Sequence, residues 1–300
     1  MKSVRLTIVT GQFKLSLAKW FMAGCILLLK IVPGQSQDMS GKQIFDRMLR
    51  VYAEATTYQD QGRVQTDFYE IGQTKPKFTT IQDFTMAYDR KGGRFRFQYE
   101  TQPKSSDDKP EKMVIWSQEG DVHVWWSLWD STSHEASLGS ALGIATGVSG
   151  TASRKVPFLL IAERTDAGWG IDSLKDVKLI GTDTLDKSSC YRLTGHVPGA
   201  YWKNKEAVLW VDQNTFLLRR IDENNSISKT KQLVKMSLTY QPVLNKPIAN
   251  EALTFEPPRS TRLVEVSSKL NLRYIVYALI ALIGAGWLIY LRSRNRKQTL

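Results

Sequence analysis

The stretch Arg94-Phe95-Arg96-Phe97-Gln98-Tyr99 alternates polar and aromatic residues without a break. Successive side chains of a β-strand point to opposite faces of a sheet, so this alternation predicts a strand with one buried, aromatic face. Residues 121–128 repeat the pattern, with Val122 and Val124 among their alternating apolar positions. Strands that bury a single face are typical of antiparallel sheets, which sets the fold class.

Similar segments, separated by turn-rich sequence, continue on both sides of this stretch. We predict strands at residues 61–68, 79–89, 94–100, 112–118, 121–128, 176–183, 189–197, 206–212, 216–223 and 229–240. A helix is expected before them, because Ser40 and Gln43 match a capping box and Ile44, Met48 and Val51 recur at helical spacing.

Residues 131–165 interrupt the strands. Small and apolar residues at 134–144 and 156–162 predict two short helices, joined by a loop at 147–153. Long insertions of this kind are commonly lids or binding loops. The predicted fold is therefore mainly β with some α: a strongly curved antiparallel sheet, or incomplete β-barrel, with an N-terminal helix and a helical lid insertion.

Residues 274–291, YIVYALIALIGAGWLIYL, form a run of eighteen residues without a charge. As a helix this run would be about 27 Å long, close to the thickness of a bilayer's hydrocarbon core. Four basic residues follow it in 292–300 without an acid, which is typical of the cytoplasmic side. We therefore expect one C-terminal transmembrane helix, with a buried helix of a soluble protein as the alternative.

The first 36 residues resemble a signal peptide, with basic residues, a short apolar run and small residues near Ser36. An uncleaved anchor and lipidation at Cys25 are alternatives. After cleavage Cys190 would be the single cysteine, and an exported domain without a disulfide fits a bacterial envelope. The predicted division is a signal peptide at 1–36, a periplasmic domain at 38–258, a linker at 259–273, the membrane helix at 274–291 and a basic tail at 292–300.

The formal charge of +12 comes mostly from these ends. Nine of the 41 lysines and arginines lie in residues 1–37 and 292–300, which contain no acid, so 32 basic residues face 29 acidic ones elsewhere. A domain whose positive and negative charges nearly balance gives no reason to expect nucleic acid as a partner. The location that follows is the bacterial inner membrane, single-pass, with the bulk of the chain in the periplasm and the C-terminus in the cytoplasm.

No motif in the sequence argues for catalysis. His123, His134 and His196 are too scattered for a local metal motif. Ser149 lies in Gly-Val-Ser-Gly, which resembles a nucleophile elbow only superficially because the second glycine comes one position early. We expect a protein that is not an enzyme and that holds neither a metal nor a cofactor.

Large aromatic residues are concentrated in the first run of strands. An ordinary core would explain them, but they would also suit a partly hollow sheet that holds an apolar ligand and is closed by leucines of the insertion. The candidate lining residues are Phe84, Tyr88, Phe95, Phe97, Trp116, Trp126, Leu138, Leu142, Leu159 and Leu160.

Several short motifs resemble the bacterial LolA/LolB-like lipoprotein-carrier superfamily. These are Tyr58-x-Asp60-x-Gly62, Leu209-Trp210-Val211-Asp212-x-x-Thr215-x-x-Leu218 and Phe255-Glu256-Pro257-Pro258. Gly147-Val148-Ser149-Gly150 with Pro157-x-Leu159-Leu160 is similar to its DUF2092 branch. The resemblance covers residues 38–258 and implies a half-open antiparallel barrel with a helical lid that holds acyl chains. It implies no catalytic residue.

The predicted function is therefore binding. We expect an inner-membrane-anchored periplasmic protein that holds the acyl chains of a lipid or lipoprotein in an apolar half-barrel cavity. The alternative is an envelope sensor or interaction module that uses the same fold to bind a protein partner through an exposed apolar patch.

Overall fold

The structure is a computed structural model, and it describes residues 39–70, 72–103, 109–161, 170–197, 205–227, 232–259 and 262–263. The predicted signal peptide, most of the predicted linker, residues 274–291 and the basic tail lie outside these ranges. All described elements belong to one compact unit that begins at Ser40.

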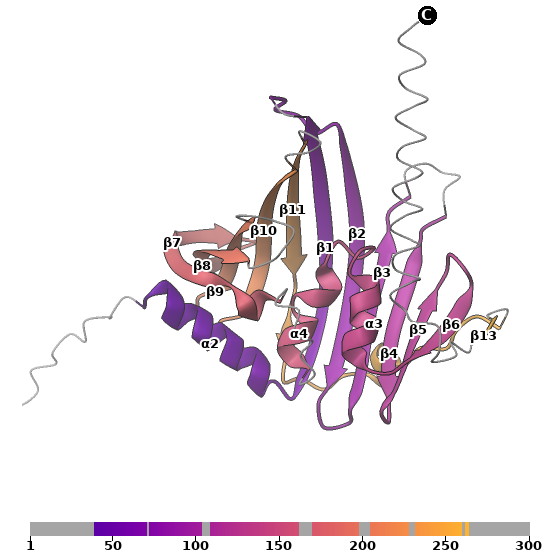
Figure 1. Ribbon diagram of the computed structural model, residues 1–300. Helices are drawn as coiled ribbons and strands as arrows, with labels where there is room; N and C mark the ends of the chain where they lie inside the picture. The colour runs from indigo at the N-terminus through magenta and orange to yellow at the C-terminus, as the bar shows by residue number, and fades with distance from the viewer. Residues whose placement is uncertain are drawn as a thin grey trace, which may run out of the picture. The chain divides into compact units, whose positions relative to one another are not determined.

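Helices and strands follow one another in an order close to that predicted (Figure 1). The helices are α2 (Gly41–Glu54), α3 (Leu138–Ala145), η1 (Ala152–Arg154), α4 (Pro157–Leu160), η2 (Ile171–Ser173) and α5 (Asn250–Leu253). The strands are β1 (Thr57–Glu70), β2 (Phe78–Asp89), β3 (Arg94–Thr101), β4 (Lys112–Gln118), β5 (Asp121–Trp126), β6 (Ser131–Glu135), β7 (Lys175–Leu185), β8 (Ser188–Val197), β9 (Lys205–Asp212), β10 (Leu218–Ile227), β11 (Gln232–Tyr240), β12 (Val243–Leu244) and β13 (Arg262–Leu263).

All of these strands join one open sheet in the order β13-β6-β5-β4-β3-β2-β1-β11-β10-β9-β8-β7, with β12 beside β1. Every pairing is antiparallel except that of β13 with β6. The ten predicted strands are all present. β6 was not predicted, because Ser-Thr-Ser-His-Glu has no apolar alternation to mark it.

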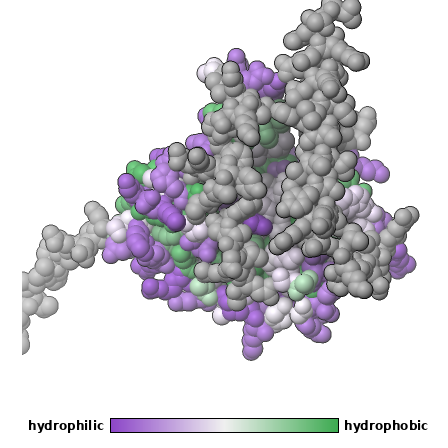
Figure 2. All heavy atoms as spheres, viewed as in Figure 1, coloured by the Kyte–Doolittle hydropathy of each residue, from purple (hydrophilic) through white to green (hydrophobic). Residues whose placement is uncertain are grey.

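The two faces of the sheet differ in what covers them. Tyr58, Val64, Phe97 and Leu238 are buried on one face, called the inner face here, over which α2, α3 and α4 lie (Figure 1). In the same view, hydrophobic residues show between hydrophilic ones (Figure 2). The opposite, outer face carries the polar positions of the alternating strands, such as Arg96. The predicted one-sided burial is confirmed for β3, whose burial alternates along the strand, whereas β4 is buried on both faces.

Helix α2 begins where the capping box predicts. Ser40 Oγ accepts from the backbone N–H of Gln43, whose side chain accepts from the N–H of Ser40 at 2.8 Å. Ile44, Met48 and Tyr52 are buried along one side of the helix. Its first residue must be glycine, because a Cβ at Gly41 would lie 2.3 Å from a backbone nitrogen of β7.

A smaller apolar cluster lies on the outer face. Val114, Trp116 and Trp125 are buried there, and Phe255 packs on them with its ring 5.1 Å from that of Trp116. The Arg96 guanidinium donates to the carbonyl oxygens of residues 251 and 254, at 3.0 and 2.9 Å. The chain after β12 is thereby held across β3 to β5.

The predicted fold class needs one correction. The open, curved sheet with an N-terminal helix and a helical insertion is present. Within the described ranges, however, no helix is long and apolar enough to cross a membrane, and residues 274–291 lie outside them. The predicted transmembrane helix and the predicted single-pass inner-membrane location are therefore not supported by any described helix. A long uncharged run in a sequence permits a membrane-spanning helix but does not show that one forms.

Candidate functional site

The insertion between β6 and β7 forms the lid of the inner face, defined here as residues 138–161. Its first helix, α3, starts at Ser137, whose Oγ accepts from the N–H of Ser140 at 3.1 Å. Its second helix, α4, starts with Pro157 at the first helical position, where a missing N–H costs nothing. α3 lies against β4, β5 and β6, while α4 lies against α2 and η1. The lid thus consists of two helices that contact different elements and together cover the inner face.

The loop between α3 and α4 packs directly on the centre of the sheet. Gly150 has a φ of 56°, and a Cβ there would lie 2.7 Å from Val64 Cγ1 and 3.4 Å from Gln82 Oε1. Ser149, the serine of the Gly-Val-Ser-Gly sequence, is buried and donates to Ser153 Oγ at 3.2 Å. Both serines therefore stabilise the loop.

Nine of the ten predicted lining residues lie on the inner face or in the lid. Phe84 and Phe97 stack with ring centroids 6.0 Å apart, and Tyr88 meets Phe95 at 6.4 Å. The residues of this group that are buried are Phe84, Tyr88, Phe95, Phe97, Leu138, Leu142, Leu159 and Leu160. In this state they form a packed core, because side chains with almost no exposed surface border no space that holds water.

Trp126 and Trp116 are placed differently from the other eight. Trp126 is on the inner face by register, but its Nε1 donates to Glu111 at 2.7 Å at the margin of the sheet. Trp116 lies on the outer face, where its ring stacks on His123 at 5.1 Å. The β4 register places Ile115 inward and Trp116 outward, so Trp116 cannot line an inner cavity.

A buried ion pair joins the lid to the sheet. Lys155, just after η1, places its Nζ 2.5 Å from Glu223 Oε1 on β10. The side chains are only 4% and 1% exposed. No local motif marks either residue, since they are 68 positions apart. Sequence reasoning missed both, although a lysine beside the apolar lid sequence Val156-Pro157-Phe158 was a usable signal.

Residues that are paired across neighbouring strands form rows on the inner face, and the polarity of these rows changes along the strands. The rows that contain Tyr88, Met86 and Phe84 are mostly apolar and aromatic, with Asp60 opposite Met86 on β1. The next row pairs Ile221, Leu238 and Val64 with Gln82, and the row after it pairs Glu223, Met236, Thr66 and Thr80. The lid loop and Lys155 lie over these two mixed rows.

Beyond the mixed rows the inner face becomes apolar again. Phe68 and Phe78 stack with ring centroids 4.2 Å apart at the far ends of β1 and β2. Phe78 remains 46% exposed. The apolar surface therefore reaches past the described lid into a region open to solvent.

Under α2 the inner face carries a buried carboxyl group. Asp60 Oδ2 accepts from the Tyr58 hydroxyl at 2.7 Å, and Oδ1 accepts from the N–H of Gln241 at 2.7 Å. Burial raises the pKa of Asp60 to about 7, against the lowering effect of these hydrogen bonds. The carboxyl also raises the pKa of the buried Tyr58, where burial is the larger cause. This is the Tyr-x-Asp-x-Gly motif of the sequence.

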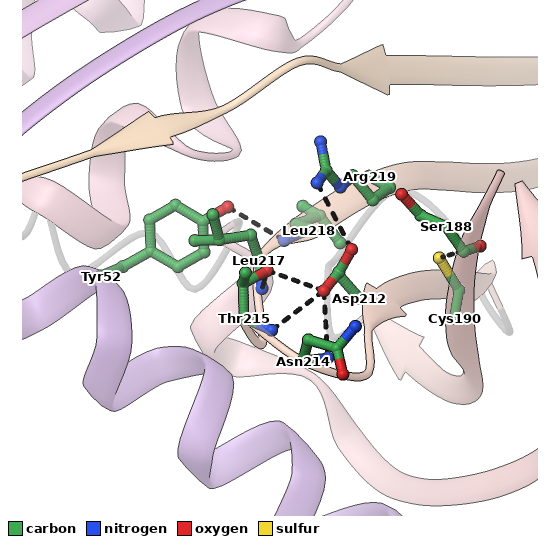
Figure 3. A network of polar contacts seen from close by, with 9 residues as sticks. All are labelled: Tyr52, Ser188, Cys190, Asp212, Asn214, Thr215, Leu217, Leu218 and Arg219. Carbon is green, nitrogen blue, oxygen red and sulfur yellow. Dashed lines mark hydrogen bonds and ion pairs between the residues drawn. The ribbon is translucent and has the colours of Figure 1, made fainter. Parts of the chain in front are cut away.

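The second motif also has a structural role (Figure 3). Asp212 Oδ1 accepts from the N–H groups of Asn214 and Thr215, at 3.0 and 2.9 Å, and so holds the turn between β9 and β10. Although burial opposes it, these hydrogen bonds keep the pKa of Asp212 below its usual range. Tyr52 of α2 accepts from the N–H of Leu218 at 3.1 Å. The motif thus fixes the hairpin and docks the helix on it.

Metal chemistry finds no support in the part of the chain that the structure describes. Three or more His, Cys, Asp or Glu side chains do not gather there in a group that could hold an ion. His123 and His134 do meet across β5 and β6 on the outer face, with ring centroids 5.3 Å apart. Burial and the neighbouring imidazole lower the pKa of His123.

Comparison with known proteins gives matches among solved structures alone. No family model matches the sequence, and no curated protein matches it. The lipoprotein LppX of Mycobacterium tuberculosis matches with a TM-score of 0.36 and 15% identity, over 69% of this chain and 95% of its own. A LolA superfamily protein of Nitrosomonas europaea matches with 0.30 and 10%, over 72% and 98%.

A third match is the complex of MucA and MucB from Pseudomonas aeruginosa. Its TM-score is 0.37 at 12% identity, over 72% of this chain and 61% of that one. The matched structures thus include a member of the superfamily that the motifs resemble. TM-scores below 0.5 at such identities assign no function to this chain, and the DUF2092-like branch stays a prediction.

Proposed function

We propose that this protein binds the acyl chains of a lipid or lipoprotein between its lid and the inner face of its sheet. The observation that carries the proposal is the largely apolar inner face, whose aromatic rows lie on both sides of two mixed rows. It is roofed by a separate segment of chain and extends past that roof to Phe78, which stays 46% exposed. The proposed activity is binding, without catalysis.

The energy for such binding would come from apolar area removed from water. Burial contributes roughly 0.8 kcal/mol for each methylene group, so a chain of about ten methylenes offers roughly 8 kcal/mol before the entropic cost of association. Aromatic and aliphatic side chains without charge, such as Phe84 and Leu142, suit a ligand that offers only CH₂ groups.

Entry of a chain requires the lid to move, because the lining side chains pack against one another in this state. Two contacts hold the lid loop down: the packing of Gly150 on Val64, and the ion pair of Lys155 with Glu223. An acyl chain would enter from the exposed end near Phe78 and displace the lid leucines from the rings.

A disulfide that locks the lid would test this proposal. A Cβ at Gly150 would lie 3.4 Å from Val64 Cβ, close to the separation of about 3.8 Å in ordinary disulfides. In the full chain with Val64→Cys and Gly150→Cys, the reduced form is expected to bind a fluorescent fatty acid. The oxidised form is expected to lose that binding, and reduction to restore it.

The single variants Val64→Cys and Gly150→Cys are the matched controls, since each has the strain of one substitution and no lock. Native mass spectrometry of the unmodified chain should also show co-purified lipid. Equal binding by the oxidised and reduced double variant would place the ligand elsewhere, and a chain that binds no acyl probe in any form would end the proposal.

A second function has one observation in its favour. The turn between β5 and β6 exposes Leu128 by 60% and Trp129 by 53%. Such a paired apolar tip is the feature expected of a module that docks on a protein partner. Photo-cross-linking from position 129, with position 63 on the outer face as the control, would recover a partner at 129 alone if this reading is right.

A further inference from the structure

The lid loop covers two polar atoms that the sheet and the loop leave without partners. Among the described residues, Gln82 Oε1 and Thr151 Oγ1 are buried and form no hydrogen bond. They belong to one place, because Gly150, next to Thr151, packs against the Gln82 side chain. A buried acceptor without a donor costs about 1–3 kcal/mol, so these atoms are ready to receive a donor.

The lysine that follows this loop already has a carboxylate partner. Lys155 Nζ, four residues after Thr151, lies 2.5 Å from Glu223 Oε1. The strand register sets Glu223 on β10 in the row next to that of Gln82, which lies three strands along the sheet on β2. An anionic head group beside Gln82 would need a cation, and Lys155 is already paired with Glu223. A buried charge without a partner is strongly unfavourable.

We infer that the ligand head group bound at this place is uncharged and donates hydrogen bonds, as a hydroxyl or an amide N–H does. Gln82 Oε1 is its main acceptor, and Thr151 Oγ1 its second. The acyl chain would then run from the mixed rows onto the aromatic rows around Phe84 and Phe97. This inference rests on the proposed binding function and adds the class of amphiphile: acylglycerol-like or acylamide-like, rather than a free fatty acid.

Competition binding on the full chain tests this inference with three ligands of one chain length: 1-monolauroylglycerol, laurate and methyl laurate. Monolauroylglycerol is expected to bind about tenfold more tightly than laurate, since it supplies donors and carries no charge. Methyl laurate, which has no donor, should fall below monolauroylglycerol by about fivefold.

The variant Gln82→Leu should lower the affinity for monolauroylglycerol by about fivefold to tenfold and leave that for methyl laurate unchanged. Gln61→Leu, on the outer face of the neighbouring strand, is the matched control and should change neither. Thr151→Val provides a second variant if Gln82→Leu does not fold.

Laurate binding as tightly as monolauroylglycerol would overturn the inference and would point to Arg154 or Lys155 as an anion partner. An equal loss for all three ligands in Gln82→Leu would overturn it too, since that result shows a packing effect. Failure of every ligand to bind is a different outcome, because it removes the proposed function itself.

Discussion

Breaking the ion pair between Lys155 and Glu223 should destabilise the protein far more than breaking a surface pair of similar geometry. The two side chains are 4% and 1% exposed and 2.5 Å apart. Lys155→Met leaves a carboxylate buried without its lysine, so we expect a loss of about 3–5 kcal/mol in the free energy of unfolding. Glu223→Met should cost a similar amount for the converse reason.

The double variant decides the physical cause. With both charges replaced by methionine, no charge is left to desolvate, and the stability should return to within about 1 kcal/mol of the wild type. The coupling energy of this double-mutant cycle, the summed cost of the single variants minus that of the double variant, would then be at least about 5 kcal/mol. Urea denaturation of the full chain, followed by tryptophan fluorescence at low and high salt, measures all four proteins.

The pair of Arg63 with Asp83 is the matched control. Its atoms are 2.6 Å apart, but its side chains are 53% and 44% exposed. Solvent and salt screen such a pair, so its cycle should give about 0–1 kcal/mol and lose that in high salt. Equal coupling in the two cycles, or a double variant as unstable as the sum of the singles, would refute the burial argument.

Three further predictions concern stability. Asp60 keeps its proton to about pH 7 in the native state and releases it near pH 4 when the chain is unfolded. The free energy of unfolding should therefore fall by about 3 kcal/mol as the pH rises from 4 to 7. Asp60→Asn should flatten that dependence in denaturation curves measured across this range. Gly62→Ala should cost about 2–3 kcal/mol, because its Cβ would lie 2.4 Å from a backbone oxygen. Gly147→Ala is the control, because a Cβ at Gly147 would meet open space. Equal melting temperatures for Gly62→Ala and Gly147→Ala would contradict the close packing at Gly62. Phe255→Ala should cost about 2 kcal/mol and shift the fluorescence of Trp116; an unchanged spectrum would mean that the segment is not docked there.

The sequence predicted the positions of ten strands along the chain because local patterns carry them. Alternation of period two gives the strands, and the Ser40 capping box gives the start of α2. Where a strand lacks apolar residues, as in β6, the pattern fails, and the structure was needed. The single-pass topology was inferred from length and hydropathy, and no described helix supports it.

The candidate site divides in the same way. Eight of the ten expected lining residues are buried on the inner face or in the lid because strand parity and helix spacing assign faces without knowledge of partners. Trp116 was misplaced because β4 is a continuous apolar run buried on both faces, so its sequence has no alternation that assigns a face. Phe255, which packs on Trp116, comes from far along the chain.

The sequence by itself determined the alternation and the lid's position in the chain, since each depends on neighbours along the chain. Only the tertiary structure decided that Lys155 meets Glu223 and that Gln82 lies beneath Gly150. The physical reason is that hydrogen bonds and ion pairs need atoms within about 3 Å, and that distance is set by strand register and lid packing rather than by spacing in the sequence.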